Sequence, residues 1–123
     1  MKLIWIGVAG ALGTLERYAL AGAVQRSVRS SFPWGTVGVN VLGCLLIGVA
    51  WSAFESRVHI TSEVRTPVLV GFLGAFTTFS AFALDTGALV RDGAGAWAFG
   101  KVVLQNAAGL AALFLGMVFG RLL

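Results

Sequence analysis

The sequence predicts an all-α membrane protein with four transmembrane helices, the third of which is broken. Of the 123 residues, 58% are hydrophobic and only 11% are charged, and the mean hydropathy is +0.90. Soluble domains carry roughly 25% charged residues, so this composition indicates a chain that lies in a bilayer. The apolar residues fall into stretches of about 18 to 25 residues, the length that a helix needs to cross the hydrocarbon.

The predicted spans cover residues 3–24, 35–54, 66–90 and 96–122. The connections between them are short and polar, which leaves no room for a soluble domain. We therefore expect residues 1–123 to form one four-helix transmembrane domain. The start of the chain resembles a signal peptide only superficially, because Glu16 and Arg17 stand where a small-residue cleavage site would lie, so the first span is expected to be retained.

The basic residues are divided evenly between the two sides of this predicted bundle. One side carries Lys2, Arg57, Arg65 and Arg121, and the other carries Arg26, Arg29, Arg91 and Lys101. The positive-inside rule orients a membrane protein by an excess of Lys and Arg on one side, and here there is none. We therefore expect insertion in both orientations and pairing of two copies as an antiparallel, dual-topology dimer. A single orientation set by other features is the alternative.

Several classes of function are disfavoured by the same residues. The formal net charge of +4 is scattered along the chain without a basic run, so nucleic acid is not an expected partner. The single cysteine, Cys44, cannot form an internal disulfide. We find no hydrolase triad, metal-ligand cluster or nucleotide-binding loop in the sequence, and we do not expect an enzyme.

Residues 71–85 are unlike a plain spanning helix. Gly71 and Gly74 weaken the helix, and three hydroxyl groups follow at membrane depth, those of Thr77, Thr78 and Ser80. A broken backbone at that depth is tolerated only where protein buries it or where water or an ion satisfies it. Phe79 and Phe82 are spaced i, i+3 and share one helical face. Together these features suggest an ion path; a packed helix whose hydroxyls bond to its own carbonyls is the alternative.

Polar side chains also occur in the other spans. An amide in hydrocarbon needs a partner, so Asn40 is expected either to clamp two helices or to offer its N–H groups to an anion. Asn106 is a second amide, in the fourth span. Arg17 could reach the interface or draw anions into a vestibule. In the same fourth span a small-residue stripe predicts close contact with another helix, through Ala108, Ala112, Gly116 and Gly120.

Over essentially its whole length the sequence resembles the Fluc (CrcB-type) fluoride channel family. Three motifs carry the resemblance: Gly10-Ala-Leu-Gly13 running to Arg17-Tyr18, Trp34-Gly-Thr-Val-Gly-Val-Asn40, and Gly71-Phe-Leu-Gly74-Ala-Phe-Thr-Thr-Phe-Ser-Ala-Phe82. The resemblance implies a multi-pass protein of the inner (plasma) membrane. It also implies an antiparallel dimer with two fluoride pores and a central structural sodium ion, which passes fluoride passively and relieves fluoride toxicity.

The resemblance also implies roles for individual residues. Phe79 and Phe82 would be the aromatic pair of the pore, with Asn40 as a pore amide and Ser80 as a hydroxyl of its polar track. Thr78 and Asn106 are candidates for the same lining. Arg17 would be the arginine of the vestibule. The backbone carbonyls of Gly74 and Thr77 would hold the sodium ion.

The sequence departs from the family pattern at four positions. Ala81 stands where a threonine is usual, Thr14 replaces an alanine, and Leu110 and Phe114 occupy positions that often carry hydroxyls. A heterodimer with a paralogous subunit is therefore an alternative to the homodimer. The main rival function is a small multidrug resistance-type, proton-coupled transporter that uses Glu16. A purely structural membrane protein is a third alternative, which leaves the clustered hydroxyls and phenylalanines unexplained.

Overall fold

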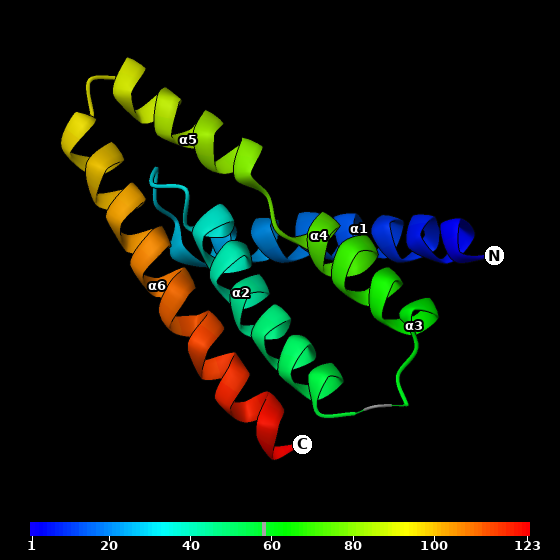
Figure 1. Ribbon diagram of the computed structural model, residues 1–123. Coiled ribbons are helices and arrows are strands. Elements are labelled where there is room, and N and C mark those ends of the chain that lie inside the picture. Colours follow the sequence, from blue (N-terminus) through cyan, green and yellow to red (C-terminus); the bar gives the residue numbers. More distant parts are fainter. Residues whose placement is uncertain (58) are drawn as a thin grey trace.

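The computed structural model describes residues 1–57 and 59–123, and the regular structure of that part of the chain is entirely helical. Within it, the prediction of four long apolar helical spans is confirmed: Lys2–Val28, Trp34–Glu55, Ser62–Arg91 and Gly95–Leu122. The first, second and fourth are the helices α1, α2 and α6 (Figure 1). The third comprises α3 (Ser62–Thr66), the π-helical segment η1 (Pro67–Leu73), α4 (Gly74–Phe76) and α5 (Phe79–Arg91).

The helix ends differ from the predicted ones where local hydrogen bonds extend the helices. Helix α1 continues to Val28. The next residue, Arg29, caps it with a left-handed φ of 50° and donates its N–H to the carbonyl of Gln25. The Gln25 side chain then closes the loop, because Nε2 donates to the carbonyls of Ser30 (2.6 Å) and Phe32 (3.0 Å) and Oε1 accepts from the N–H of Gly35 (3.0 Å). Helix α3 lies largely in the predicted second connection.

Helices α2 and α6 form the most extensive contact and run side by side (Figure 1). The small-residue stripe of α6 serves this contact, as predicted. A Cβ atom added at Gly116 would overlap the Leu45 carbonyl oxygen, and one at Gly48 would overlap that of Leu113. The missing side chains therefore let the two backbones approach closely, as small residues do in membrane helices.

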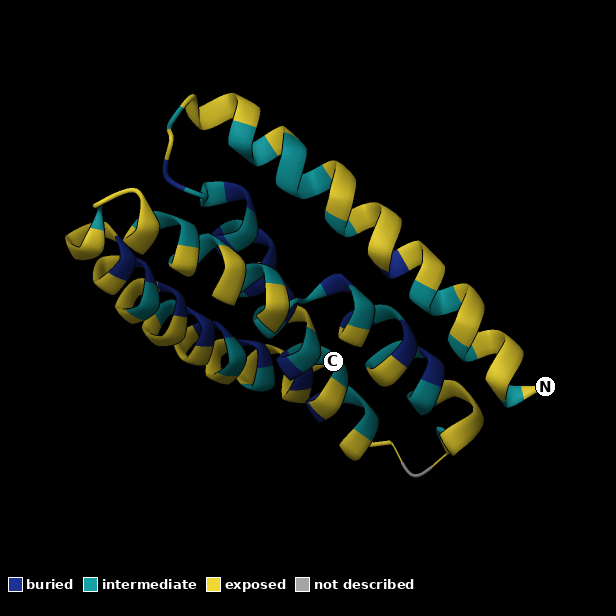
Figure 2. Cartoon of the chain, turned by 90° about the horizontal axis from the view of Figure 1, so that it is seen from above, coloured by how far each residue is buried: buried dark blue, intermediate teal, exposed yellow. Residues whose placement is uncertain are grey.

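Helix α1 packs on η1, α2 and α4 rather than along α6. A Cβ atom at Gly13 would overlap the carbonyl oxygen of Phe72, and one at Gly71 would lie 2.9 Å from that of Ile6. Apart from these contacts with η1, α2 and α4, helix α1 is largely exposed, and Gly13 is its one buried residue (Figure 2). An apolar helix with so little contact inside its own chain presents its remaining surface to lipid or to another subunit.

The backbone between α4 and α5 is extended at two residues. Thr77 has φ and ψ of −89° and 155°, and Thr78 has −149° and 121°. Gly71 and Gly74, which were expected to weaken the helix, both stay in the helical segments, and Gly74 has φ and ψ of −65° and −34°. Helix α5 begins again when the Thr78 hydroxyl accepts the N–H of Ala81 at 3.2 Å. Helix α5 then packs mainly on α6 (Figure 1).

Candidate functional site

Asn40 holds the extended residues in place. Its Oδ1 accepts the N–H of Thr78 at 2.8 Å, and its Nδ2 donates to the Thr78 carbonyl at 3.0 Å. The carboxamide thus pairs with Thr78 as a neighbouring strand would, and it does so with only 8% of the residue exposed. Of the two interpretations of Asn40, the helix clamp is the one seen in these bonds, while the second N–H of Nδ2 remains available to a ligand.

Beside this pair lies a cavity of about 370 Å³, which we call the Phe82 cavity. It brings together five of the six predicted pore residues: Asn40, Thr78, Phe79, Phe82 and Asn106. Thr77, Gln105 and the apolar Leu110 also line it, and no charged side chain does among the described residues. Its polar groups are therefore amides and hydroxyls in an otherwise apolar wall.

The two phenylalanines form one side of the Phe82 cavity. Their ring centroids lie 5.4 Å apart, with an angle of 40° between the ring planes. Phe82 is half-buried, whereas Phe79 is 79% exposed in the single chain. A large ring so exposed in the middle of a membrane span implies that lipid or a second subunit covers it.

Ser80, the sixth predicted pore residue, lies off the cavity wall, and Asn106 lines the cavity from an exposed position. Ser80 is exposed, and its hydroxyl lies 3.2 Å from that of Thr78 rather than on the cavity wall. Asn106 is exposed, and its Nδ2 donates to the carbonyl of Val102 at 2.7 Å, one turn earlier in α6. Leu110 and Phe114, where hydroxyls were noted as missing, are 57% and 62% exposed.

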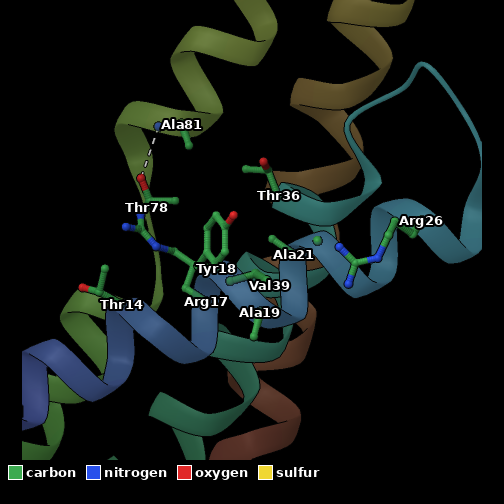
Figure 3. Close-up of a pocket in the computed structure, with 11 residues that line it drawn as sticks. Thr14, Arg17, Tyr18, Ala19, Ala21, Arg26, Thr36, Val39, Thr78 and Ala81 are labelled. Atoms are coloured by element: carbon green, nitrogen blue, oxygen red, sulfur yellow. Dashed lines mark hydrogen bonds between the residues drawn. The ribbon is translucent and has the colours of Figure 1, made fainter.

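A second cavity, of about 540 Å³, lies on the other side of Thr78 and is called the Arg17 cavity here. Arg17 and Arg26 line it from α1, and Thr78 and Ala81 from the start of α5 (Figure 3). In Figure 3 the Arg17 side chain extends toward Thr78. Thr78 also lines the Phe82 cavity, so a cavity lined by two arginines and one without charged lining residues share this residue.

Glu16, the residue on which the transporter alternative depends, lies elsewhere. It is exposed on α1 and lines neither of these two cavities. A proton-coupled transporter needs its carboxylate on the substrate path, and neither of these two cavities supplies one at Glu16.

The carbonyl groups of Gly74 and Thr77 lack their usual helical donors. In a continuous helix the N–H of Thr78 would donate to Gly74 and that of Ala81 to Thr77. Here these two N–H groups donate to Oδ1 of Asn40 and to Oγ1 of Thr78 instead. The break therefore leaves two backbone acceptors in a membrane span for some other donor or for a cation.

The site also contains residues that the sequence analysis missed. Lys101 was assigned to the basic residues that flank the membrane, but it is 0% exposed and lies between α5 and α6. Gln105 is 9% exposed and lines the Phe82 cavity, one residue before the predicted Asn106. The signal was the i, i+4 spacing of Lys101, Gln105 and Gly109, all of which are buried on one face of α6.

Comparisons with known proteins give one consistent result. Residues 4–117 match the profile of the family described as "CrcB-like protein, Camphor Resistance (CrcB)". A protein of Desulforapulum autotrophicum named "Fluoride-specific ion channel FluC" is 54% identical over 122 residues, which are 99% of this chain and 98% of the relative. Proteins with the same name from Nitrosococcus oceani and Parabacteroides distasonis are 49% and 40% identical, over 99% and 98% of this chain and 98% and 94% of their own length.

Proposed function

Since the chain belongs to the CrcB-like family, we propose that it is a fluoride-specific ion channel that exports cytoplasmic fluoride passively and so relieves fluoride toxicity. Hydrogen fluoride is a weak acid that crosses membranes in its neutral form and dissociates at neutral pH. The anion is then trapped inside, and a selective passive pore in the inner (plasma) membrane lets it leave. This role matches the names of the relatives and requires no enzyme chemistry.

The observation that carries the proposal is the composition of the Phe82 cavity. Fluoride is small and strongly hydrated, so a pore must replace its water with hydrogen-bond donors. The cavity offers amide N–H groups from Asn40, Gln105 and Asn106 and the hydroxyl of Thr78, whereas the Thr77 hydroxyl already donates to the Leu73 carbonyl at 3.1 Å. The edges of aromatic rings carry the positive end of the ring quadrupole, so Phe79 and Phe82 can add contacts that suit an anion. Among the described residues no carboxylate lines the cavity, so no side chain on its wall repels an anion.

The Arg17 cavity supports the proposal as an entrance. Arg17 and Arg26 place two guanidinium groups beside a wide space that ends at Thr78. Positive charge in a cavity with low-dielectric walls raises the local concentration of anions. Thr78, whose hydroxyl lies 3.2 Å from that of Ser80, would then pass the ion from this vestibule to the uncharged cavity.

The working unit in this proposal is an antiparallel homodimer with two pores. The Phe82 cavity is open in the single chain, and Phe79, Asn106 and Leu110 on its rim are exposed. A partner subunit would close it against lipid. The absence of hydroxyls at Leu110 and Phe114 leaves a paralogous partner as the alternative to a second identical copy.

A structural sodium ion fits the break between α4 and α5. The carbonyls of Gly74 and Thr77 are hard oxygen ligands whose helical donors are used elsewhere. A small hard cation would satisfy them at membrane depth, which is what buried backbone acceptors require. Related by the twofold axis of the proposed dimer, two such breaks would supply four carbonyl groups.

The test is fluoride efflux from liposomes that contain the purified protein, measured with a fluoride electrode. We expect rapid efflux down the fluoride gradient, no comparable chloride efflux, and no dependence on a proton or sodium gradient. Uptake of organic cations driven by a proton gradient, without fluoride efflux, would instead support the Glu16 transporter. The matched control is Glu16→Gln, which should leave fluoride efflux within about twofold of that of the unchanged protein, because Glu16 lines neither cavity.

A further inference from the structure

Lys101 is a fully buried basic residue that the proposed ion path does not itself use. It lies six residues into α6 and is 0% exposed. Its Nζ donates to the Phe82 carbonyl at 3.1 Å and to Oγ1 of Thr86 at 3.3 Å, both on α5. An ammonium group away from water is costly unless it is hydrogen-bonded or paired, so this arrangement needs a reason.

Phe82 is the residue on which the contacts of Lys101 converge. The Nζ atom lies over the Phe82 ring, 4.3 Å from its centroid, in addition to its bond with the carbonyl of the same residue. Thr86 reinforces the arrangement, because its hydroxyl donates to that carbonyl at 2.7 Å. Lys101 therefore contacts Phe82 at both its backbone and its ring.

The surrounding groups show that Lys101 does not contact the ion path directly. Phe82 and Gln105 line the Phe82 cavity, but Lys101 does not. Two of its three N–H groups donate to oxygen atoms of α5, and its side chain has no exposed surface at which an anion could bind. The acidic group that acts on it is Asp85, whose Oδ2 is buried without a hydrogen-bond partner among the described residues.

We propose that Lys101 is a positioning residue for Phe82: its ammonium group holds the ring by one face, so that the ring edge is kept for the ion. The inference rests on the proposed function. The face of an aromatic ring is its negative side and the edge its positive side, so a cation settles on the face. It also draws electron density toward that face, which makes the edge hydrogens more positive. The ring edge thereby becomes a better contact for fluoride in the cavity.

The test compares two neutral variants, Lys101→Met and Lys101→Gln. Met keeps the length of the side chain, and Gln keeps a hydrogen-bond donor to α5, but neither places a cation over the ring. We expect both to assemble, and both to reduce fluoride efflux from liposomes about tenfold, which is the size of a partly buried cation–π contact. Efflux from either assembled variant that equals that of the unchanged protein overturns the inference.

A double-mutant cycle separates positioning from simple packing. If Lys101 acts through the ring, Lys101→Met should have no further effect on efflux in a Phe82→Ile background. A purely structural clamp between α5 and α6 would lower efflux and melting temperature by the same amount in both backgrounds, because its bond to the Phe82 carbonyl persists in Phe82→Ile. That result contradicts the proposal.

Thr86→Val is the matched control, and it also serves if the Lys101 variants do not assemble. It removes one hydrogen bond of Nζ and the bond from the Thr86 hydroxyl to the Phe82 carbonyl, while leaving the ammonium over the ring. We expect its efflux to stay within about twofold of that of the unchanged protein; a tenfold loss would show that the hydrogen bonds, and not the ring contact, matter. If the unchanged protein conducts no fluoride at all, the proposed function fails first, and the two failures are distinguishable.

Discussion

The helix break in the third span becomes a candidate binding site through three residues: Asn40, Thr78 and Phe79. Asn40 satisfies the N–H and carbonyl of Thr78, which no helix can satisfy at extended dihedral angles. Phe79 follows at once, at the first position of α5, and the i, i+3 spacing brings Phe82 to the same face. The chemistry of the cavity therefore follows from the few residues at which helical hydrogen bonding stops.

Phe79→Ile tests whether the ring edge matters. Ile keeps apolar bulk but has no positive edge, so we expect fluoride efflux to fall at least about tenfold, with the loss of a contact of order 1 kcal/mol or more. Dimer assembly should persist, because Ile keeps the apolar bulk of this exposed side chain. Efflux is measured with an electrode, and assembly by size-exclusion chromatography.

The matched control is Phe114→Ile, which removes another ring that is 62% exposed but lines neither cavity. It should leave efflux unchanged within about twofold. Equal losses in the two variants would mean that Phe79 acts in packing or membrane insertion and not in the ion path.

Several residue-level features could be anticipated from the sequence, because membrane depth makes polar groups conspicuous. Asn40 and Thr78 stand out in this way, and Phe79 and Phe82 stand out by their i, i+3 spacing and by the family resemblance; the structure gathers all four at one cavity. Lys101 was not, since a lysine near a predicted helix end has the same sequence signature whether it reaches the interface or turns inward. Its partners on α5 become apparent only when α5 and α6 are packed together.

At the scale of the elements, the third span concentrates the irregular backbone. It contains a π-helical segment that begins at Pro67, and further along the extended residues Thr77 and Thr78. Irregular turns of this kind often mark functional sites in helices. The sequence pointed to the glycines of this span, but Gly71 allows the close approach of α1, and Gly74 stays helical. The position of the extended residues depends on Asn40 of α2, a tertiary contact that local propensity does not contain.

The proposed sodium site makes a prediction about this element that does not depend on transport. Sodium that binds only the folded dimer stabilises it by RT ln(1 + [Na⁺]/Kd), which is about 1.4 kcal/mol at tenfold above Kd. We expect the melting temperature of the purified protein to be higher in sodium chloride than in N-methylglucamine chloride at the same ionic strength. Lithium and potassium serve as controls for size. Identical melting in all four salts would rule out a structural sodium ion.

At the scale of the whole molecule, a single chain leaves large apolar surfaces uncovered. The Phe82 cavity is open, Phe79 is exposed on its rim, and α1 is exposed along most of its length (Figure 2). The number and approximate length of the spans could be predicted, because hydrophobic length alone determines them. The pairing that we propose depends on how these surfaces are arranged in space, which the sequence pattern does not contain.

Dual topology is testable by labelling. With Lys101 buried, the remaining flanking charges are four on one side (Lys2, Arg57, Arg65 and Arg121) and three on the other (Arg26, Arg29 and Arg91), which is still close to balance. In a Cys44→Ser background, Arg29→Cys and Arg57→Cys are each expected to react partly with a membrane-impermeant reagent in intact inner-membrane vesicles, and fully after permeabilisation. Complete protection of one position and complete labelling of the other would show a single orientation.

The most direct test of the central claim is the reversal potential of the reconstituted chain, expressed alone, under opposed fluoride and chloride gradients in a planar bilayer. A passive fluoride-specific channel predicts a reversal potential at the fluoride equilibrium potential, unmoved when the chloride gradient or the pH gradient is changed. A reversal potential that follows chloride would contradict the selectivity that we assign to the Phe82 cavity. A potential that follows the proton gradient would contradict passive conduction itself.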